Sequence, residues 1–531
     1  MIKSVFIQNF KIFESFKLPL NDDLNIVVGN NESGKSTILE AVGLALTKRI
    51  GGKPVEYELS SYLFNKQCVD QYVRAVKEGG NPALPKILIE LYLAESDELQ
   101  YLRGSNNSEK TDAVGIKLEI EFDEDYREEY GKLLEDRAKI KALPAEYYRV
   151  HWYSFANTAI TARSLPIGLS HIDATTIRLQ SGTDYYLHNI ISDGLTPKER
   201  VALSIAYRNL KEQFSNEPSI KAINQGLTQK KSAITDKDLA IALDVSQKTN
   251  WEANLIPYLD DLPFQFIGKG EQSALKIMLA LERQVSDCNV ILIEEPENHL
   301  SFSSMSHLIS KIKDKCAGRQ IIIATHSAYV LNKLGIEKVI FLHGNNTSSL
   351  THLSPDTQNY FQKLSGYDTL RLILAKKAIL VEGPSDELIV QKAYLLKHGK
   401  MPLDNGVDVL NVRGLSFSRF LDIAKELKKN VVVVTDNDGD YQTRVIAKYA
   451  QYANIPTIRI CADSDNTAET LEPQIAKCNG LAVLNKIFGT AFADVATLVE
   501  YMKNNKTECA LKILVTDEVI VIPKYLQDAV E

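Results

Sequence analysis

A group of carboxylates follows a strongly apolar run in the C-terminal part of the chain. Residues 431–434 are consecutive valines, and residues 435–440 are Thr, Asp, Asn, Asp, Gly and Asp. A continuous β-branched run is typical of a strand that is buried on both faces. Because side chains two apart on a strand point to the same side, we expect Asp436 and Asp438 to converge beyond its end, where Gly439 permits a turn. A site built only from carboxylate oxygens favours Mg²⁺ or Mn²⁺ over zinc.

A second acidic group precedes this run and also follows an apolar segment. Residues 378–381 predict a short buried strand that ends at Glu382, after which the chain turns through Gly383 and Pro384. Asp386 falls in the first turn of the helix that we expect next, a position that favours an acid in any protein. Alternating strands and helices from here onward predict a small α/β domain with a parallel sheet.

Three known patterns compete for the acidic run. A calcium-binding EF-hand loop needs Gly where Tyr441 stands and Glu where Ala447 stands, which excludes it. A phosphatase of the haloacid dehalogenase type would use Asp436 as its nucleophile, but that motif usually opens its domain and leaves Glu382 unexplained. The third pattern resembles the Toprim domain, with which five residues agree in order: Glu382, Asp386, Gly414, Asp436 and Asp438.

The N-terminal half carries a phosphate-binding loop between a predicted strand, residues 24–28, and a predicted helix, residues 38–46. The loop has the pattern G-x-x-x-x-G-K-S, whose glycines let backbone N–H groups face phosphate oxygens at a helix N-terminus. Lys35 should reach the β- and γ-phosphates, and the Ser36 hydroxyl should help to hold Mg²⁺. The chain is therefore predicted to bind a nucleoside triphosphate. The expected binding residues are Gly29, Asn30, Asn31, Gly34, Lys35, Ser36 and Thr37.

Two further apolar strands end in residues of types that bind or hydrolyse nucleotides in other proteins. Residues 290–293 lead into Glu294 and Glu295, as expected for a metal-bridging carboxylate and a base that orients the attacking water. Residues 321–324 lead towards His326, although an isolated histidine at a strand end is more often structural. A glycine-rich segment precedes both strands and opens a helix; it is Gly268-Lys269-Gly270-Glu271-Gln272.

The order of these motifs resembles that of ATP-binding-cassette ATPases of the recombination and repair type, such as the RecF and SMC heads. The resemblance implies that ATP is sandwiched in a head-to-tail homodimer, with His326 at the γ-phosphate. The residues expected to act across that dimer are Gly268, Gly270 and Glu271. The chain departs from the pattern because Glu294 replaces the usual Asp, the signature serine is absent, and a Gln loop is not identifiable. These departures bear on the hydrolysis rate more than on ATP binding.

An ATPase of this type followed by a Toprim domain resembles the OLD (overcoming lysogenization defect) family of nucleases, including the GajA-like nucleases of Gabija defence systems. The resemblance implies an ATP-regulated, divalent-metal-dependent DNA endonuclease or nickase with a role in anti-phage defence. It also points to Glu472 as a late metal ligand and to Lys506 as a cation near the scissile phosphate.

From this resemblance we expect two metal ions in the Toprim site, roughly 4 Å apart, and one Mg²⁺ with ATP. Lys506 would offset the charge that develops in the transition state, whereas Ser36 and Glu294 would hold the magnesium of the nucleotide. The expected ligands of the first Toprim metal are Glu382, Asp436 and Asp438; those of the second are Asp386 and Glu472, with Asp440 as an outer ligand.

The fold class expected from these patterns is α/β, with an ATPase head of mixed sheets and a helical insertion, followed by the small Toprim domain. Thr196, Pro197 and Glu199 are typical of a helix start, and the charged helical sequence after them fits an arm or dimerisation element and an internal packing helix equally well. The expected parts are residues 1–190 and 261–360 for the ATPase, 191–260 for the insertion, 361–377 for a linker and 378–531 for the Toprim domain.

The bulk composition of the 531 residues sets the remaining expectations. A net charge of −7 gives no global basic signal, so DNA would have to bind at local patches. The six cysteines form no C-x-x-C pair, which argues against zinc fingers and a disulfide framework. Without a long apolar run, we expect a cytoplasmic protein with no membrane contact. The expected partners are DNA, another copy of the chain, and a second protein or nucleic-acid component of a defence system.

Two other functions are compatible with the motifs. A RecF-like, ATP-dependent DNA-binding clamp or sensor would carry an inactive Toprim fold, but the retained acids argue against it. A topoisomerase or primase also uses Toprim metals. A topoisomerase, however, needs a tyrosine nucleophile on a separate strand-passage domain, for which the chain leaves no length after the ATPase.

Overall fold

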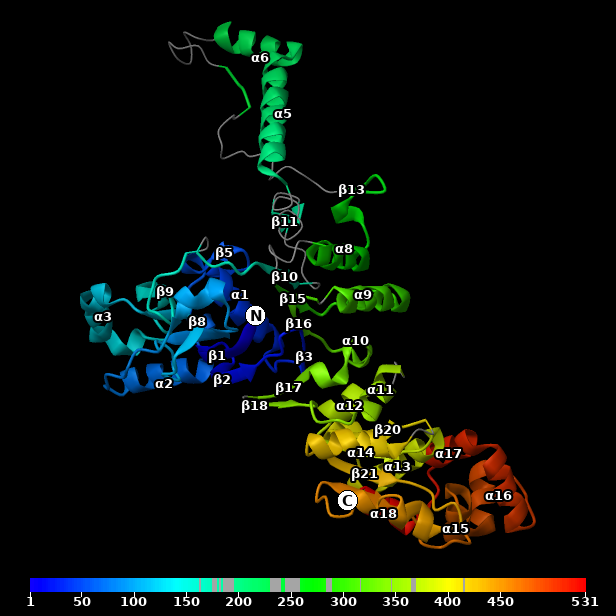
Figure 1. Ribbon diagram of the computed structural model, residues 1–531. Coiled ribbons are helices and arrows are strands. Elements are labelled where there is room, and N and C mark those ends of the chain that lie inside the picture. The colour runs from blue at the N-terminus through cyan, green and yellow to red at the C-terminus, as the bar shows by residue number, and fades with distance from the viewer. Residues whose placement is uncertain are drawn as a thin grey trace. The chain divides into compact units, whose positions relative to one another are not determined.

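The computed structural model describes two compact units (Figure 1). Unit 1 comprises Met1–Asn25 and Gly34–Thr325, and unit 2 comprises Ile26–Ser33 and His326–Glu531, so the boundary crosses the phosphate loop. The domain boundaries expected from the sequence stay predictions. The described residues are all except 162–163, 174–178, 181–182, 185–194, 230–239, 244–257, 283–288, 316, 345, 364–368 and 414–415.

An antiparallel sheet forms one part of unit 1. Alternate residues of its strands, such as Val5 and Ile7, are fully buried, because successive side chains point to opposite faces. Its strands, in spatial order, are β2 (Phe13–Pro19), β1 (Ile2–Phe10), β6 (Ile87–Leu93), β8 (Ala113–Phe122) and β9 (Tyr148–Ser154). Shorter elements beside it are β4 (Arg49–Ile50), β5 (Lys53–Pro54), α2 (Lys66–Lys77), β7 (Arg103–Gly104) and α3 (Arg127–Leu133).

Three parallel strands in unit 1 lie beside the helix that follows the phosphate loop. They are β10 (Leu169–Asp173), β15 (Val290–Glu294) and β16 (Gln320–Ala324), with β15 in the middle. Helix α1 (Lys35–Thr47) contacts all three, and α8 (Lys269–Glu282) contacts β10 and α9 (Phe302–Asp314). Because parallel strands end at the same edge, the acids Asp173 and Glu294 come to lie together at that edge.

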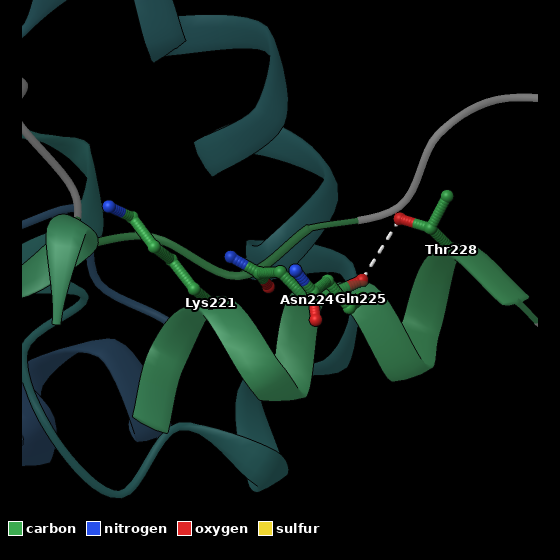
Figure 2. Close-up of a pocket in the computed structure, with 4 residues that line it drawn as sticks. All are labelled: Lys221, Asn224, Gln225 and Thr228. Carbon is green, nitrogen blue, oxygen red and sulfur yellow. Dashed lines mark hydrogen bonds between the residues drawn. The ribbon is translucent and has the colours of Figure 1, made fainter. Parts of the chain in front are cut away.

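The helical insertion contains α5 (Pro197–Asn216) and α6 (Pro218–Gln229), which contact each other (Figure 1). The predicted helix start is confirmed, since Glu199 N donates to the Thr196 hydroxyl and the Glu199 carboxylate accepts from Thr196 N. Much of the rest of the expected insertion lies outside the described residues. Figure 2 shows a shallow depression on α6, where the Thr228 hydroxyl donates to the Asn224 carbonyl at 2.9 Å. Its polar lining belongs to neither predicted site.

The first part of unit 2 joins the strand before the phosphate loop to a short helical region. β3 (Leu24–Gly29) pairs in parallel with β17 (Val339–His343), which pairs with β18 (Asn346–Ser349) in the opposite direction. A bidentate ion pair, with Arg371 Nε 3.0 Å from Asp408 Oδ2, ties the last of three helices to the Toprim sheet. These helices are α10 (Ala328–Leu334), α11 (Pro355–Lys363) and α12 (Thr369–Leu374).

The predicted Toprim sheet is present and wholly parallel. Its order is β20 (Val407–Asn411), β19 (Lys377–Val381), β21 (Asn430–Val434) and β22 (Ile458–Cys461). Helices cover both faces of this sheet, so side chains on both faces of its strands are buried. This explains the uninterrupted valines of β21, all of which are buried. The helices are α13 (Pro384–His398), α14 (Phe417–Glu426), α15 (Leu471–Phe488), α16 (Val495–Asn504), α17 (Lys506–Val515) and α18 (Lys524–Ala529). Within the described ranges, none of the protein's helices meets the length and hydropathy of a membrane span.

Candidate functional site

The two glycines of the phosphate loop stand where a side chain would collide with its surroundings. A Cβ on Gly29 would lie 2.4 Å from Ser33 Oγ. At Gly34, a Cβ would lie 2.5 Å from Phe13 Cζ, and φ is +98°, a conformation that suits glycine. Helix α1 begins directly afterwards at Lys35, so its first N–H groups and positive dipole end are placed for an anion. Of the other expected loop residues, Asn30 and Asn31 are exposed and Thr37 is buried.

The residues expected to hold the magnesium of the nucleotide are in contact within unit 1. The Ser36 hydroxyl donates a hydrogen bond to Glu294 Oε1. Burial raises the pKa of Glu294, and neighbouring carboxylates add to the rise, so this acid lies in a strongly negative environment. Burial lowers the pKa of the Lys35 ammonium group, whereas Glu295 and Glu294 oppose that change. This edge of the parallel strands therefore combines a buried cation with carboxylates beside a helix N-terminus.

Glu295, the expected water-orienting base, sits in an unusual backbone conformation. Its φ is +46°, which non-glycine residues rarely adopt and which recurs at functional sites. The Asn298 amide donates to Glu295 Oε2 at 2.6 Å and holds the carboxylate. His326 belongs to unit 2, where it lines a depression together with Asn30 from the tip of the phosphate loop.

The glycine-rich segment before α8 has one tightly packed glycine and an exposed remainder. A Cβ on Gly270 would lie 2.1 Å from the His299 carbonyl oxygen, so this position needs glycine for packing inside unit 1. Gly268 has open space around it, and both Gly268 and Glu271 are exposed. Exposure is what a role across a dimer requires, and that role stays a prediction.

In the Toprim domain, neighbouring strands bring Glu382 and Thr435 together. β19 and β21 pair with Leu380 opposite Val433, so the residues just past their ends meet at one edge of the sheet. The Thr435 hydroxyl donates to Glu382 Oε1 at 2.6 Å.

Asp386 occupies the first turn of α13, and its Oδ2 accepts a hydrogen bond from Gly383 N at 3.0 Å. Burial raises the pKa of Asp386 to about 7, and the charge of Glu382 adds to the rise. Burial also raises the pKa of Asp436 to about 8, with Asp386, Glu382 and then Glu472 contributing in that order. These four acids therefore share one electrostatic environment. We call them the acidic cluster: Glu382, Asp386, Asp436 and Glu472.

The two positions taken from the family resemblance lie next to each other. Lys506 Nζ is 3.4 Å from Glu472 Oε1, and the Thr470 hydroxyl donates to Glu472 Oε2 at 2.9 Å. The Glu472 side chain is buried, whereas that of Lys506 is half exposed. The Lys506 charge opposes the rise in pKa of both Asp386 and Asp436, so the lysine acts on these two acids as well as on Glu472.

Asp438 departs from the strand geometry expected for it, and Asp440 lies further along the same loop. The strand ends at Val434, and Asp438 has a φ of +48°, so the rule for side chains two apart on a strand does not apply to it. Asp438 is exposed, whereas Asp436 is partly buried in the acidic cluster. Asp440 is also exposed and accepts from Thr443 N at 3.1 Å, which lowers its pKa and gives it a capping role.

The donor set fits a hard divalent cation. It consists of carboxylates alone, and a bound cation would relieve the repulsion that adds to burial in raising the pKa of Asp386 and Asp436. Among the described residues, however, no three acidic, histidine or cysteine side chains already form a coordination arrangement. The carboxylates of Glu382, Asp386 and Glu472 each accept a hydrogen bond from a neighbouring group, namely Thr435, Gly383 N and Thr470. Gly414, the remaining match to the Toprim pattern, lies outside the described residues.

Two tyrosines beside the acidic cluster had no signal in the sequence. Tyr449 is buried near Thr435, Glu382 and Asp438; burial raises its pKa to about 12. Tyr525 lies on α18, and burial with the charges of Asp436 and Asp386 raises its pKa well above the usual value. Neither belongs to a recognisable motif; Tyr449 stands in the turn after the helical residues 442–447, and Tyr525 stands on the C-terminal helix α18.

Three family models match parts of the chain. Residues 373–438 match the family model "Overcoming lysogenization defect protein-like, TOPRIM domain". Residues 4–235 match an AAA domain, and residues 197–332 match an AAA domain described as a putative AbiEii toxin of a type IV toxin–antitoxin system.

Curated relatives cover most of the chain at low identity. Endonuclease GajA of Bacillus cereus strain VD045 is 22% identical over 467 residues, covering 82% of this chain and 74% of the relative. Endonuclease GajA of strain HuB5-5 is 22% identical over 92% of this chain and 82% of its own length. Among solved structures, an SMC head bound to the winged-helix domain of ScpA aligns with 66% of this chain and 97% of its own, at 14% identity and a TM-score of 0.34. The chain thus carries an OLD-like TOPRIM domain and AAA-domain sequence, consistent with a GajA-like member of the OLD family.

Proposed function

We propose that the protein is an ATP-regulated DNA endonuclease or nickase that depends on Mg²⁺ or Mn²⁺ and serves in anti-phage defence. The observation that carries the proposal is the acidic cluster with Lys506, at the carboxyl edge of a parallel sheet in an OLD-like TOPRIM domain. Both GajA relatives are named endonucleases, which supports the same reaction.

The acidic cluster would hold the metal ions, which when bound polarise the phosphodiester and activate water. Glu382, Asp386, Asp436 and Glu472 supply the carboxylates from four different elements, and the exposed Asp438 and Asp440 would complete the ligands on the solvent side. Thr435 fixes one Glu382 oxygen and leaves the other available. Lys506, half exposed next to Glu472, would offset negative charge on the scissile phosphate.

The nucleotide site would regulate this reaction. Lys35, Ser36 and Glu294 would bind ATP and its magnesium, and Glu295 would orient the attacking water. Gly268, Gly270 and Glu271 would complete the site of a second copy, which makes a homodimer part of the proposal. DNA and a second component of a defence system are the other proposed partners.

Incubation of supercoiled plasmid with the protein tests the proposal. We expect nicked or linear DNA with Mg²⁺ or Mn²⁺, none in EDTA, and a change in rate on adding ATP. The rival clamp or sensor predicts ATP-dependent DNA binding with the plasmid left supercoiled under every metal, Ca²⁺ included.

The effect of divalent metal on thermal stability should depend on pH. The folded protein keeps protons on Asp386 and Asp436 up to pH values of about 7 and about 8, whereas the unfolded chain loses them near pH 4. Without metal, these two groups therefore contribute less and less to the free energy of unfolding as the pH rises from about 4 to about 8. A bound cation needs the ionised acids, so the rise in Tm with Mn²⁺ over EDTA should be larger at about pH 8 than at about pH 5.5.

Differential scanning fluorimetry in the two buffers measures this difference. In the variant Asp436→Asn, residue 436 cannot ionise, so the Mn²⁺-induced rise in Tm should depend less on pH. An equal Mn²⁺-induced shift at both pH values would contradict the assignment of these acids as ligands.

A further inference from the structure

The side chain of Asn437, in the acidic run after β21, is fully buried and hydrogen-bonded. Its Nδ2 group donates to the carbonyl oxygens of Asp463 at 2.8 Å and Asp465 at 2.9 Å. Its Oδ1 atom accepts a hydrogen bond from Gly439 N at 2.8 Å. A buried amide that uses both of its N–H donors and its carbonyl oxygen specifies one arrangement of the backbone segments around it.

The bond to Gly439 helps to fix the loop that follows β21. We call residues 435–440 the acidic loop. The chain leaves the extended conformation there, with a φ of +48° at Asp438 and +80° at Gly439. An asparagine side chain that bonds the N–H group two residues later closes a tight turn of the backbone. Asn437 therefore helps to set the backbone from which its two neighbours, Asp436 and Asp438, project.

The two bonds that Asn437 donates reach a second loop, residues 462–470, which lies between β22 and α15. A backbone bond from Asp438 N to Glu469 O, at 3.2 Å, joins the same two loops. The second loop leads directly into α15, whose first turn carries Glu472. The amide of Asn437 thus ties the loop that carries two expected ligands to the segment that carries a third.

We propose that Asn437 is a positioning residue of the Toprim metal site, which holds Asp436 and Asp438 at a fixed distance from Glu472 for divalent-cation binding. The inference rests on the proposed function, in which acids from both segments bind metal ions. Asn437 touches neither metal nor substrate in this scheme; it fixes the spacing between the segments that supply the ligands. Groups that hold metal ligands in place typically contribute about 10- to 100-fold to metal affinity.

Asn479 provides a matched control in the same domain. Its Nδ2 group donates to Ile475 O and Val521 O, each at 2.9 Å, and its Oδ1 atom accepts from Val521 N at 2.7 Å. Two donated bonds and one accepted bond are also the pattern at Asn437, but here they join α15 to the segment before α18. Asn437→Ala and Asn479→Ala therefore each remove three side-chain hydrogen bonds, and of the two only Asn437→Ala releases the acidic loop.

Asn437→Ser is the second test variant. A serine hydroxyl can still accept from Gly439 N, as it does in turns of this kind, but it is too short to reach the second loop. We expect it to weaken metal binding as Asn437→Ala does, because the bonds between the loops are lost in both. A loss in Asn437→Ala alone would assign the effect to the turn at Gly439 and overturn the proposed tie between the loops.

The measurement is Mn²⁺ binding to the full-length protein without ATP, followed by the electron paramagnetic resonance of free Mn²⁺, together with Tm in EDTA. We expect both Asn437 variants to weaken Mn²⁺ binding about 10-fold. The Mn²⁺ concentration for half-maximal plasmid nicking should rise by a similar factor, with most of the rate recovered at saturating Mn²⁺. Asn479→Ala should lower Tm in EDTA and keep wild-type Mn²⁺ affinity. A purely structural role would lower Tm without moving the half-maximal Mn²⁺ concentration.

Wild-type Mn²⁺ affinity in Asn437→Ala would overturn the inference, as would an equal loss of affinity in Asn479→Ala. If neither Asn437 variant folds while Asn479→Ala does, Asn437 serves the stability of the domain and the inference is also wrong. Failure of the proposed function looks different. In that case the wild-type protein would bind no more Mn²⁺ than Asp436→Asn does and would leave the plasmid uncut.

Discussion

Asp436→Asn should reduce metal-dependent DNA cleavage by about three orders of magnitude, or ~4 kcal/mol of transition-state stabilisation. The substitution keeps the shape of the side chain and removes the charge that would hold a cation. Since burial and neighbouring acids raise the pKa of Asp436 to about 8, the folded protein already accepts an uncharged group there. We therefore expect normal folding, and a Tm in EDTA at or above that of the wild type.

Plasmid nicking with Mg²⁺ or Mn²⁺ and thermal denaturation in EDTA measure the two effects. Asp404→Asn is the matched control, because Asp404 is an exposed acid in the same domain whose carboxylate accepts a hydrogen bond from the nearby Met401 N. Cleavage by Asp436→Asn within a few-fold of wild type would mean that the acidic cluster is not the nuclease site.

Lys35→Ala should weaken ATP binding by about 10- to 100-fold, the loss expected for a charge-assisted bond to phosphate. The nuclease site lies in the other unit and should still bind Mn²⁺. Removing Lys35 leaves Glu294 and Glu295 without a cation that opposes their repulsion, so we also expect a lower Tm for unit 1.

ATP binding by calorimetry and plasmid cleavage with and without ATP separate the two activities. If ATP restrains the nuclease, the variant cuts in the presence of ATP as the wild type does without it. If ATP stimulates it, the variant loses the stimulated rate. Retention of wild-type ATP affinity would contradict the role given to the phosphate loop.

The sequence predicted the parts of the site that depend on local rules. The valines of β21, the turn after Glu382 and the phosphate loop each follow from periodicity, glycine placement and helix ends. The alternation of strands and helices predicted the parallel sheet, and its pairing puts Glu382 and Thr435 at the same edge.

Other features depend on local backbone conformation and on contacts between segments that are far apart in the sequence. Side chains two apart on a strand point to the same side, but this does not hold for Asp438, because the backbone leaves the extended conformation after Val434. The strands β10 and β22 are only five and four residues long, and each is interrupted by polar residues, so they were not predicted. Tyr449 and Tyr525 reach the acidic cluster through helix packing, which no spacing in the sequence encodes.

Anomalous X-ray scattering from crystals grown with Mn²⁺ tests the central claim most directly. The account predicts manganese peaks between the carboxylates of Glu382, Asp386, Asp436 and Glu472, with Asp438 turned towards one of them. Crystals of Asp436→Asn should lose at least one peak. Manganese elsewhere in unit 2, or none at saturating concentration in crystals of the wild-type protein, would contradict the metal site and the nuclease mechanism built on it.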